Sequence, residues 1–389
     1  MSPLDVVVVG GRVAGASTAL LLARAGLSVA LVERGRRGSD TVSTHALMRA
    51  GVLQLSRWGV LGDVVAAGTP AVRRTVFHYP DGEDVDVSIR PRAGVDALYA
   101  PRRHLLDRLL VEAAEDAGVR VLHETTVTAL RRDATGRVAG VVGRTRTGAR
   151  VDLAAWLTIG ADGIRSRVAE QAGAATTWRG RAASAVLYRY VEDPRADGYE
   201  WIYGVGAGAG VIPTNDGASC LFVSTTPDRM RRLRRPGVER AIADLLVAAG
   251  PAAVDRAHGL RPVSPVRGWA GVPGFARESG GPGWALVGDA GYFRDPITSH
   301  GMTDALRDAE LLAGEVLAAH GGALSEQVAL VRYQQTRELL SRRLREATEG
   351  VAAYDWDARR IRSLLHEFSS AMGDEVEHLQ SLAAKAVVA

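Results

Sequence analysis

Three glycine-containing loops carry the residues of this sequence that are best suited to chemistry. They are residues 10–15 (GGRVAG), 160–163 (GADG) and 288–291 (GDAG), and each follows a short apolar run that predicts a buried strand. A glycine loop between a strand and a helix can hold a phosphate group on its backbone N–H groups. The three loops therefore predict a nucleotide site.

The first loop departs from the usual G-x-G-x-x-G pattern. Gly10 suits the tight turn and Gly15 suits close packing of helix and strand, but Arg12 replaces the middle glycine. Arg12 must point its side chain away, or its guanidinium adds positive charge to the site. Glu33 ends the next predicted strand, where an acidic residue can accept hydrogen bonds from ribose hydroxyls.

All three loops, with Pro296 downstream of the third, resemble the motifs of the class A flavoprotein monooxygenases, the p-hydroxybenzoate hydroxylase-like family. The resemblance covers roughly residues 4–320 and implies that FAD is the bound nucleotide. Helix N-capping is the alternative role for the two aspartates of the later loops. By position, the resemblance implies these cofactor-binding residues: Gly10, Gly11, Gly15, Glu33, Arg34, Ser43, Arg103, Asp162, Asp289, Pro296, Gly301, Met302 and Thr303.

Two histidines stand in segments that the resemblance places beside the flavin. His45 follows Ser43 in residues 39–45 (SDTVSTH), and His300 stands between Pro296 and Gly301. Histidine can transfer protons near neutral pH, so both are candidate catalytic residues. The alternatives are that the first segment only caps a helix and that His300 is an ordinary loop residue.

Four aromatic residues are candidates for a substrate pocket. Tyr188 and Tyr190 alternate along one predicted strand, and Trp201 and Tyr203 alternate along another. Such a pattern also fits a plain hydrophobic core, so both interpretations stay open.

The resemblance implies an FAD-dependent monooxygenase that hydroxylates or epoxidises a small to medium aromatic or polyketide-like substrate. NADPH or NADH would donate electrons, and O2 would react through a C4a-hydroperoxyflavin. The alternatives are a flavin-dependent reductase of the geranylgeranyl reductase type and a non-redox protein that uses FAD as a scaffold for ligand binding. Flavin-dependent halogenases use an active-site lysine, and the only lysine here is Lys385, which disfavours halogenation.

Composition narrows the class of protein. The 389 residues include one cysteine, Cys220, which excludes an internal disulfide and a cysteine-rich zinc site, and we expect no metal. Lys and Arg number 48 against 44 Asp and Glu, an excess too small and scattered to indicate nucleic-acid binding. No apolar run reaches the roughly 20 residues of a membrane span, so we expect a cytoplasmic protein.

The elements that must position these residues follow from hydrophobic periodicity and turn residues. Residues 4–33 predict a strand, a helix and a second strand, and a further helix is expected over residues 43–58. Residues 71–97 are β-rich, and the chain after Gly301 is helical nearly to its end. The other predictions are a helix at 102–117 and strands at 154–159, 184–191, 199–203, 218–224 and 284–287.

The predicted fold class is α/β, with a Rossmann-like FAD-binding domain interrupted by a second β-sheet domain for the substrate. We assign residues 1–70, 98–170 and 281–325 to the FAD-binding domain, 71–97 and 171–280 to the substrate domain, and 326–389 to C-terminal helices. Those last helices close the domain or form a dimer contact, so a monomer and a homodimer are both open.

Overall fold

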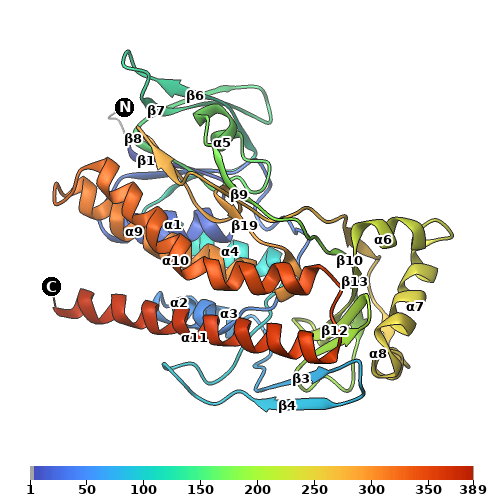
Figure 1. Cartoon of the computed structure of the whole chain (residues 1–389). Coiled ribbons are helices and arrows are strands. Elements are labelled where there is room, and N and C mark those ends of the chain that lie inside the picture. The colour runs from blue at the N-terminus through green and yellow to red at the C-terminus, as the bar shows by residue number, and fades with distance from the viewer. Residues whose placement is uncertain (1–3, 389) are drawn as a thin grey trace.

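A mostly parallel sheet forms the part of the molecule that the three glycine loops share (Figure 1). In this computed structural model, which describes residues 4–388 and the side chains of residues 4–382, the central strand β1 (Leu4–Val9) lies between β2 and β8 and runs parallel to both. The strand order is β17-β18-β8-β1-β2-β5. The other strands are β2 (Val29–Val32), β5 (Arg120–Leu122), β8 (Arg150–Gly160), β17 (Gly280–Gly281) and β18 (Trp284–Leu286).

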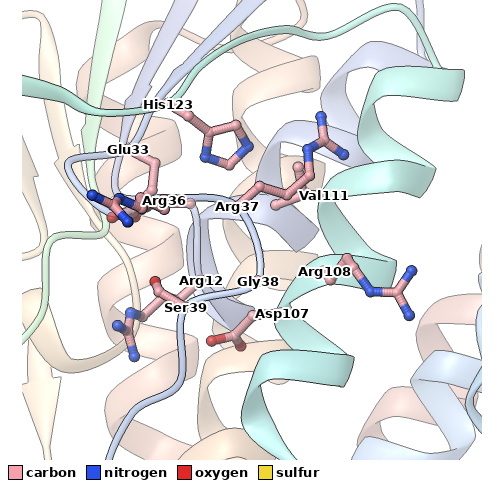
Figure 2. A pocket seen from close by; sticks show the side chains of 11 residues that line it. Arg12, Glu33, Arg36, Arg37, Gly38, Ser39, Asp107, Arg108, Val111 and His123 are labelled. Atoms are coloured by element: carbon pink, nitrogen blue, oxygen red, sulfur yellow. Dashed lines mark hydrogen bonds between the residues drawn. The ribbon is translucent and has the colours of Figure 1, made fainter. Parts of the chain in front are cut away.

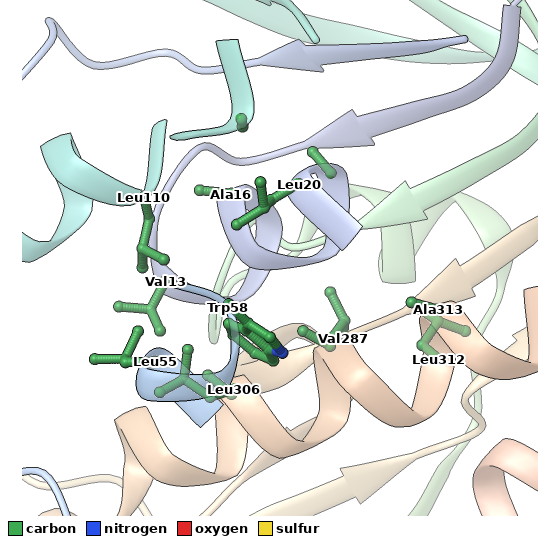
Figure 3. Close-up of a cluster of buried hydrophobic side chains, with 14 of the residues drawn as sticks. Val13, Ala16, Leu20, Leu55, Trp58, Leu110, Val287, Leu306, Leu312 and Ala313 are labelled. Atoms are coloured by element: carbon green, nitrogen blue, oxygen red, sulfur yellow. The ribbon is translucent and has the colours of Figure 1, made fainter. Parts of the chain in front are cut away.

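Both faces of this sheet are covered, which explains its continuous apolar strands. Val6 and Val8 face a core that includes Leu20 of α1 and Leu306 of α9 (Figure 3). The alternate residues of β1 face a smaller core under the antiparallel strands β6 and β7. The elements concerned are α1 (Val13–Arg24), α4 (Arg103–Asp116), α9 (Gly301–His320), β6 (Thr125–Arg132) and β7 (Val138–Thr145).

A second, mostly antiparallel sheet joins segments that are far apart in the sequence. Strand β3 (Arg74–His78) pairs in parallel with β11 (Tyr199–Gly204), so residues 71–97 complete a sheet built mainly from residues 185–262. We propose the two sheets as the cores of the two predicted domains. The remaining strands are β4 (Asp84–Ser88), β10 (Ala185–Glu192), β12 (Ala207–Pro213), β13 (Ala218–Thr225), β14 (Arg261–Pro262) and β15 (Arg267–Trp269).

The two faces of the second sheet differ. Three helices cover one face and bury aliphatic residues, namely α6 (Pro227–Leu233), α7 (Val238–Ala249) and α8 (Pro251–Ala257). The other face carries the aromatic residues of β10, β11 and β13 and turns toward the C-terminal helices. The third, small sheet consists of β9 (Thr176–Arg179), β16 (Phe275–Arg277) and β19 (Tyr292–Phe293).

The predicted helix over residues 43–58 is wrong at its start, because α2 (Arg49–Arg57) begins six residues later. Residues 43–48 run outside any helix, and His45 adopts a positive φ of 73°. The Ser43 hydroxyl accepts the His45 N–H, and Tyr188 of β10 accepts the Ser43 N–H. Such local side-chain bonds compete with helix formation. The short helices α3 (Leu61–Ala66) and α5 (Arg167–Ala172) complete the N-terminal part.

The C-terminal helices α10 (Glu326–Ala352) and α11 (Ala358–Val388) lie side by side with α9 (Figure 1). A fully buried arginine, Arg307 of α9, joins them. It donates to Asp304 and Asp308 of its own helix, to Ser341 of α10 and to Glu375 of α11. Among the described residues, no helix combines the length and apolar character that crossing a bilayer requires.

We expect Arg307→Leu to lower the free energy of unfolding by about 3 kcal/mol, because it leaves three buried carboxylates without their shared counter-ion. Exposed Arg359 of α11 offers a matched control, and Arg359→Leu should change the value by less than about 0.5 kcal/mol. Urea denaturation followed by circular dichroism measures both. Equal stabilities of the two variants would contradict the role of this network.

Candidate functional site

The first glycine loop connects β1 to α1 and requires glycine at two positions. Gly10 has a φ of 107°, and a Cβ atom there would lie 2.3 Å from the Ala161 carbonyl oxygen. A Cβ atom on Gly15 would lie 1.8 Å from the Gly10 carbonyl oxygen. No side chain caps α1, so its first N–H groups are available to a phosphate.

A small cavity of about 20 Å³ opens beside this loop (Figure 2). Glu33, at the end of β2, accepts hydrogen bonds from the N–H groups of Gly11 and Gly35, both at 2.6 Å. Arg34 beside it is exposed. Arginine side chains dominate the charged lining, which suits an anionic ligand. The lining residues are Gly11, Arg12, Glu33, Arg36, Arg37, Gly38, Ser39, Asp107, Arg108, Val111 and His123.

Arg12, which replaces the middle glycine, belongs to a charged cluster with two residues of α4. Its backbone is extended, with φ −94° and ψ −167°, so the position does not require glycine. Arg103 forms an ion pair with buried Asp107 at 3.0 Å. Burial raises the pKa of Asp107, although Arg103 and Arg12 oppose this shift. Burial also lowers the pKa of Arg12, and Asp107 opposes that shift.

Asp162 organises the second glycine loop as a helix cap. Its carboxylate accepts the Ser166 hydroxyl at 2.5 Å and the N–H groups of Arg167 at 2.7 Å and Val168 at 3.2 Å. Ser166 in turn caps α5 by accepting the Ala169 N–H. The structure thus gives Asp162 the capping role that the sequence left open, at a loop in contact with Gly10.

Asp289 differs from Asp162, because no group of the described residues forms a hydrogen bond or ion pair with its carboxylate. It is half-buried in the turn η1 (Gly288–Ala290). Burial raises its pKa to about 7, Asp304 and Asp308 add to the shift, and Arg103 opposes it. An acidic side chain in such surroundings is available to accept hydrogen bonds from ligand hydroxyls.

The start of α9 lies near the same region. Pro296 opens the turn η2 (Pro296–Thr298), Ser299 has a φ of 50°, and Gly301 at the first turn of α9 is exposed. No side chain caps this helix end, so its first N–H groups, including those of Met302 and Thr303, are suited to negative charge. The Thr303 hydroxyl accepts the Met48 N–H, which links α9 to the segment before α2.

His45 lies in the segment before α2 and is buried against strand β10 of the second sheet. Its Nε2 is hydrogen-bonded to the Tyr190 hydroxyl at 2.6 Å, and the two rings stack. Burial lowers the pKa of His45 to about 3, and the positive charges of Arg102 and Arg103 contribute. His45 is therefore neutral at pH 7. Sequence reasoning missed Arg102, whose guanidinium lies 3.6 Å from the centre of the Tyr190 ring.

A larger cavity of about 420 Å³ lies between the second sheet, α2, η2 and α11. Trp201, Tyr203 and His300 line it, whereas Tyr188 and Tyr190 contact the segment before α2 instead. Sequence reasoning missed the contribution of α11, because a long amphipathic helix carries no motif. From α11 the cavity is lined by Arg362, Leu365, His366, Phe368, Ser369, Met372, Gly373, Glu375 and Val376.

His300 is 1% exposed and connects the start of α9 to α11. Its Nε2 lies 2.9 Å from the Glu375 carboxylate, and its Nδ1 has no partner in the described part of the chain. Burial opposes ionisation of Glu375, but His300, Arg307 and Arg294 outweigh it and lower the pKa to about 2. The ionised Glu375 accepts hydrogen bonds only, so Nε2 of His300 carries a proton.

Together these features fit FAD. The glycine-dependent turn at residues 10–15, the unpartnered Asp289 and the uncapped start of α9 offer backbone donors and a free acceptor at three separated loops. His300, Asp304 and Glu375 also lie close enough to hold a metal ion. Arg307 already donates to both carboxylates, so these residues form a charge network rather than an open metal site.

Comparisons with known proteins agree with this cofactor. Residues 3–348 match the family described as FAD binding domain. The chain is 29% identical over 334 residues to the digeranylgeranylglycerophospholipid reductase of Methanothrix thermoacetophila, covering 81% of this chain and 77% of the relative. It is 28% identical over 335 residues to the ubiquinone hydroxylase UbiL of Rhodospirillum rubrum, and the match covers 81% of this chain and 72% of that relative.

Among solved structures, the chain is similar to PqsL of Pseudomonas aeruginosa, described as a probable FAD-dependent monooxygenase. The TM-score is 0.74 at 23% identity, and the match covers 94% of this chain and all of that chain. The likeness confirms the predicted fold class, an α/β fold with an FAD-binding domain.

We expect Asp289→Ala to weaken FAD binding about tenfold, because it removes a hydrogen-bond acceptor from the proposed cofactor site. The ratio of flavin to protein absorbance, followed by titration of the apoprotein with FAD, measures the effect. Exposed Asp355 supplies the control, and Asp355→Ala should keep full flavin content. An unchanged FAD affinity in the first variant would argue against this assignment.

We expect Asp289→Asn to stabilise the apoprotein at pH 8 but not at pH 4. The folded-state pKa of about 7 lies above the ordinary value of 3.8, so the charged carboxylate costs stability above pH 7, and this cost disappears as the pH falls toward 4. The gain at pH 8 should be about 2 kcal/mol, because the group is only half-buried. Thermal unfolding across this pH range tests it, and a pH-independent difference would contradict the assigned shift.

Proposed function

Since the chain belongs to the FAD binding domain family, whose match extends over residues 3–348, we propose that it is an FAD-dependent monooxygenase. NADPH or NADH donates the electrons, and O2 supplies the oxygen atom that hydroxylates or epoxidises a small to medium aromatic or polyketide-like substrate. Bound FAD supplies the redox chemistry, accepting hydride from the nicotinamide and activating O2.

The observation that carries this proposal is the cavity of about 420 Å³ that reaches the segment before α9. Ile297, Thr298 and His300 line it on the side of the proposed cofactor, and aromatic residues of β3 and β11 line the opposite side. In this proposal, the reacting end of a substrate held there lies beside the flavin and away from bulk water. Exclusion of water prevents side reactions of the reactive intermediate that an oxygenase needs for oxygen transfer.

The proposed roles of the chain's own residues follow from their surroundings. Asp289 accepts hydrogen bonds from the ribityl chain, and the N-terminal end of α9 stabilises the negative charge of reduced flavin. His300 handles a proton beside the cavity, with Glu375 holding its orientation. His45, held neutral by burial and bonded to Tyr190, positions the segment that precedes α2.

A reductase is the second candidate, because a curated relative of this chain is named a digeranylgeranylglycerophospholipid reductase. Such an enzyme would use the same cofactor site and the same apolar cavity to saturate a double bond. Halogenation is disfavoured, since Lys385 near the end of the chain is its only lysine. A ligand-binding protein without redox turnover is the third alternative.

The visible spectrum of the purified protein, before and after NADPH or NADH is added in air, tests the proposal. We expect flavin bands that bleach and return as O2 is consumed, with faster consumption when an aromatic substrate is present. Reduction of an alkene without O2 would instead identify a reductase. A protein that binds no FAD after reconstitution would contradict all of these functions.

A further inference from the structure

The large cavity is lined by α11 from Arg362 to Val376 and by the hairpin of β3 and β4, and we call the space between them the slot. One face of α11 forms its long wall through Leu365, Ser369, Met372 and Val376, which recur at helical spacing. The opposite wall contains apolar residues of β3 and β4 and of the segment that follows them. Those residues are Phe77, Val85, Val87 and Ile89.

Ion pairs connect the two walls at both ends of the slot. At one end, Arg362 of α11 binds Asp81 at 2.7 Å and Glu83 at 2.7 Å in the turn of the hairpin. At the other end, Glu377 of α11 binds Arg92 at 2.6 Å. Arg362 and Glu377 stand about four turns apart on the helix, so the ion pairs are about 22 Å apart along the slot.

The arginine and glutamate side chains of the described cavity wall already have partners, and His366 of the same wall is exposed. Arg92 and Arg362 bind the carboxylates named above, and Arg49 donates to the backbone carbonyls of residues 90, 92 and 95. Glu375 is bound by His300 and Arg307. Arg49 has no carboxylate partner among the described residues, but its donors are engaged by those backbone carbonyls. An anionic ligand would therefore have to displace those bonds and would lose its hydration between apolar walls, which is costly.

We infer that the slot takes an uncharged, elongated, apolar molecule that lies lengthwise along α11, with its reacting end at Thr298 and His300. The inference rests on the proposed function only in treating this cavity as the substrate site. Val85 and Val87, each 40% exposed, continue the apolar wall to the surface, so the far end of the molecule lies near the solvent. Specificity for the substrate then depends partly on α11, a helix that lies outside the family match because the match ends at residue 348.

Gly373 offers a direct test, because it lines the slot on α11 and a Cβ atom there would meet nothing within 4 Å. Gly373→Leu should fill the slot without disturbing the core. Gly314 of α9 is the matched control, since it is helical, exposed and equally free of neighbours. Both substitutions replace a helical glycine by a better helix former.

The probes are trans-4-hydroxystilbene, which is neutral at pH 7, and trans-stilbene-4-carboxylate, which has a similar length and a negative charge. Binding to the oxidised, FAD-loaded protein is measured by calorimetry and by perturbation of the flavin spectrum, without NADPH or NADH. We expect the neutral probe to bind about tenfold more tightly than the carboxylate. Gly373→Leu should lower the affinity for the neutral probe about fivefold, and Gly314→Leu should leave that affinity unchanged.

Equal or tighter binding of the carboxylate would overturn the inference, as would an unchanged affinity in Gly373→Leu. If that variant does not fold, Ser369→Phe at an exposed position of the same wall replaces it, with the same expected loss. Binding needs no turnover, so a protein that binds the neutral probe in the slot but does not consume O2 refutes the proposed function alone. Substrate-dependent O2 consumption together with a preference for the carboxylate refutes the inference alone.

Discussion

The fully buried guanidinium of Arg307 is the interaction on which the site depends. It bonds groups from α9, α10 and α11 at once, and the neighbouring Arg294 donates to Asp304 at 2.7 Å. Burial alone would lower the pKa of Arg307, but Asp308, Asp304 and Glu375 raise it well above its ordinary value. Each of these charged groups would be costly to bury without its partners. The network therefore favours the one arrangement of the three helices that brings all of the groups together.

This arrangement couples two regions that would otherwise be independent. The start of α9 faces the proposed cofactor, and α11 forms the long wall of the cavity. Glu375 belongs to both regions, because it binds Arg307 on one side and His300 on the other. A shift of α11 would therefore move His300 and the helix end beside the proposed cofactor. The cavity and the cofactor site are best understood as one structure.

Sequence reasoning succeeded where local pattern decides the structure. The strand–helix–strand unit of residues 4–33 and the helical C-terminal part are confirmed, because buried strands and long helices have strong periodicity. The segment 43–48 was predicted wrongly because the Tyr188 hydroxyl, 145 residues away, holds it out of a helix. Glu375 could not be found, since its partners lie 68 and 75 residues away and no spacing rule joins them. The proposed flavin contacts stay predictions.

Arg12 shows how a departure from a motif can be tolerated. The middle glycine of such loops permits close approach of the backbone to phosphate, yet the extended backbone at Arg12 accepts any residue. Gly10 and Gly15, by contrast, are required by contacts under 2.5 Å that a side chain would create. The loop therefore keeps glycine where the fold demands it and gains a cation beside Asp107 and Arg103. Asp107 forms an ion pair with Arg103 and attracts Arg12, so it partly balances both cations beside the loop that we propose to bind phosphate.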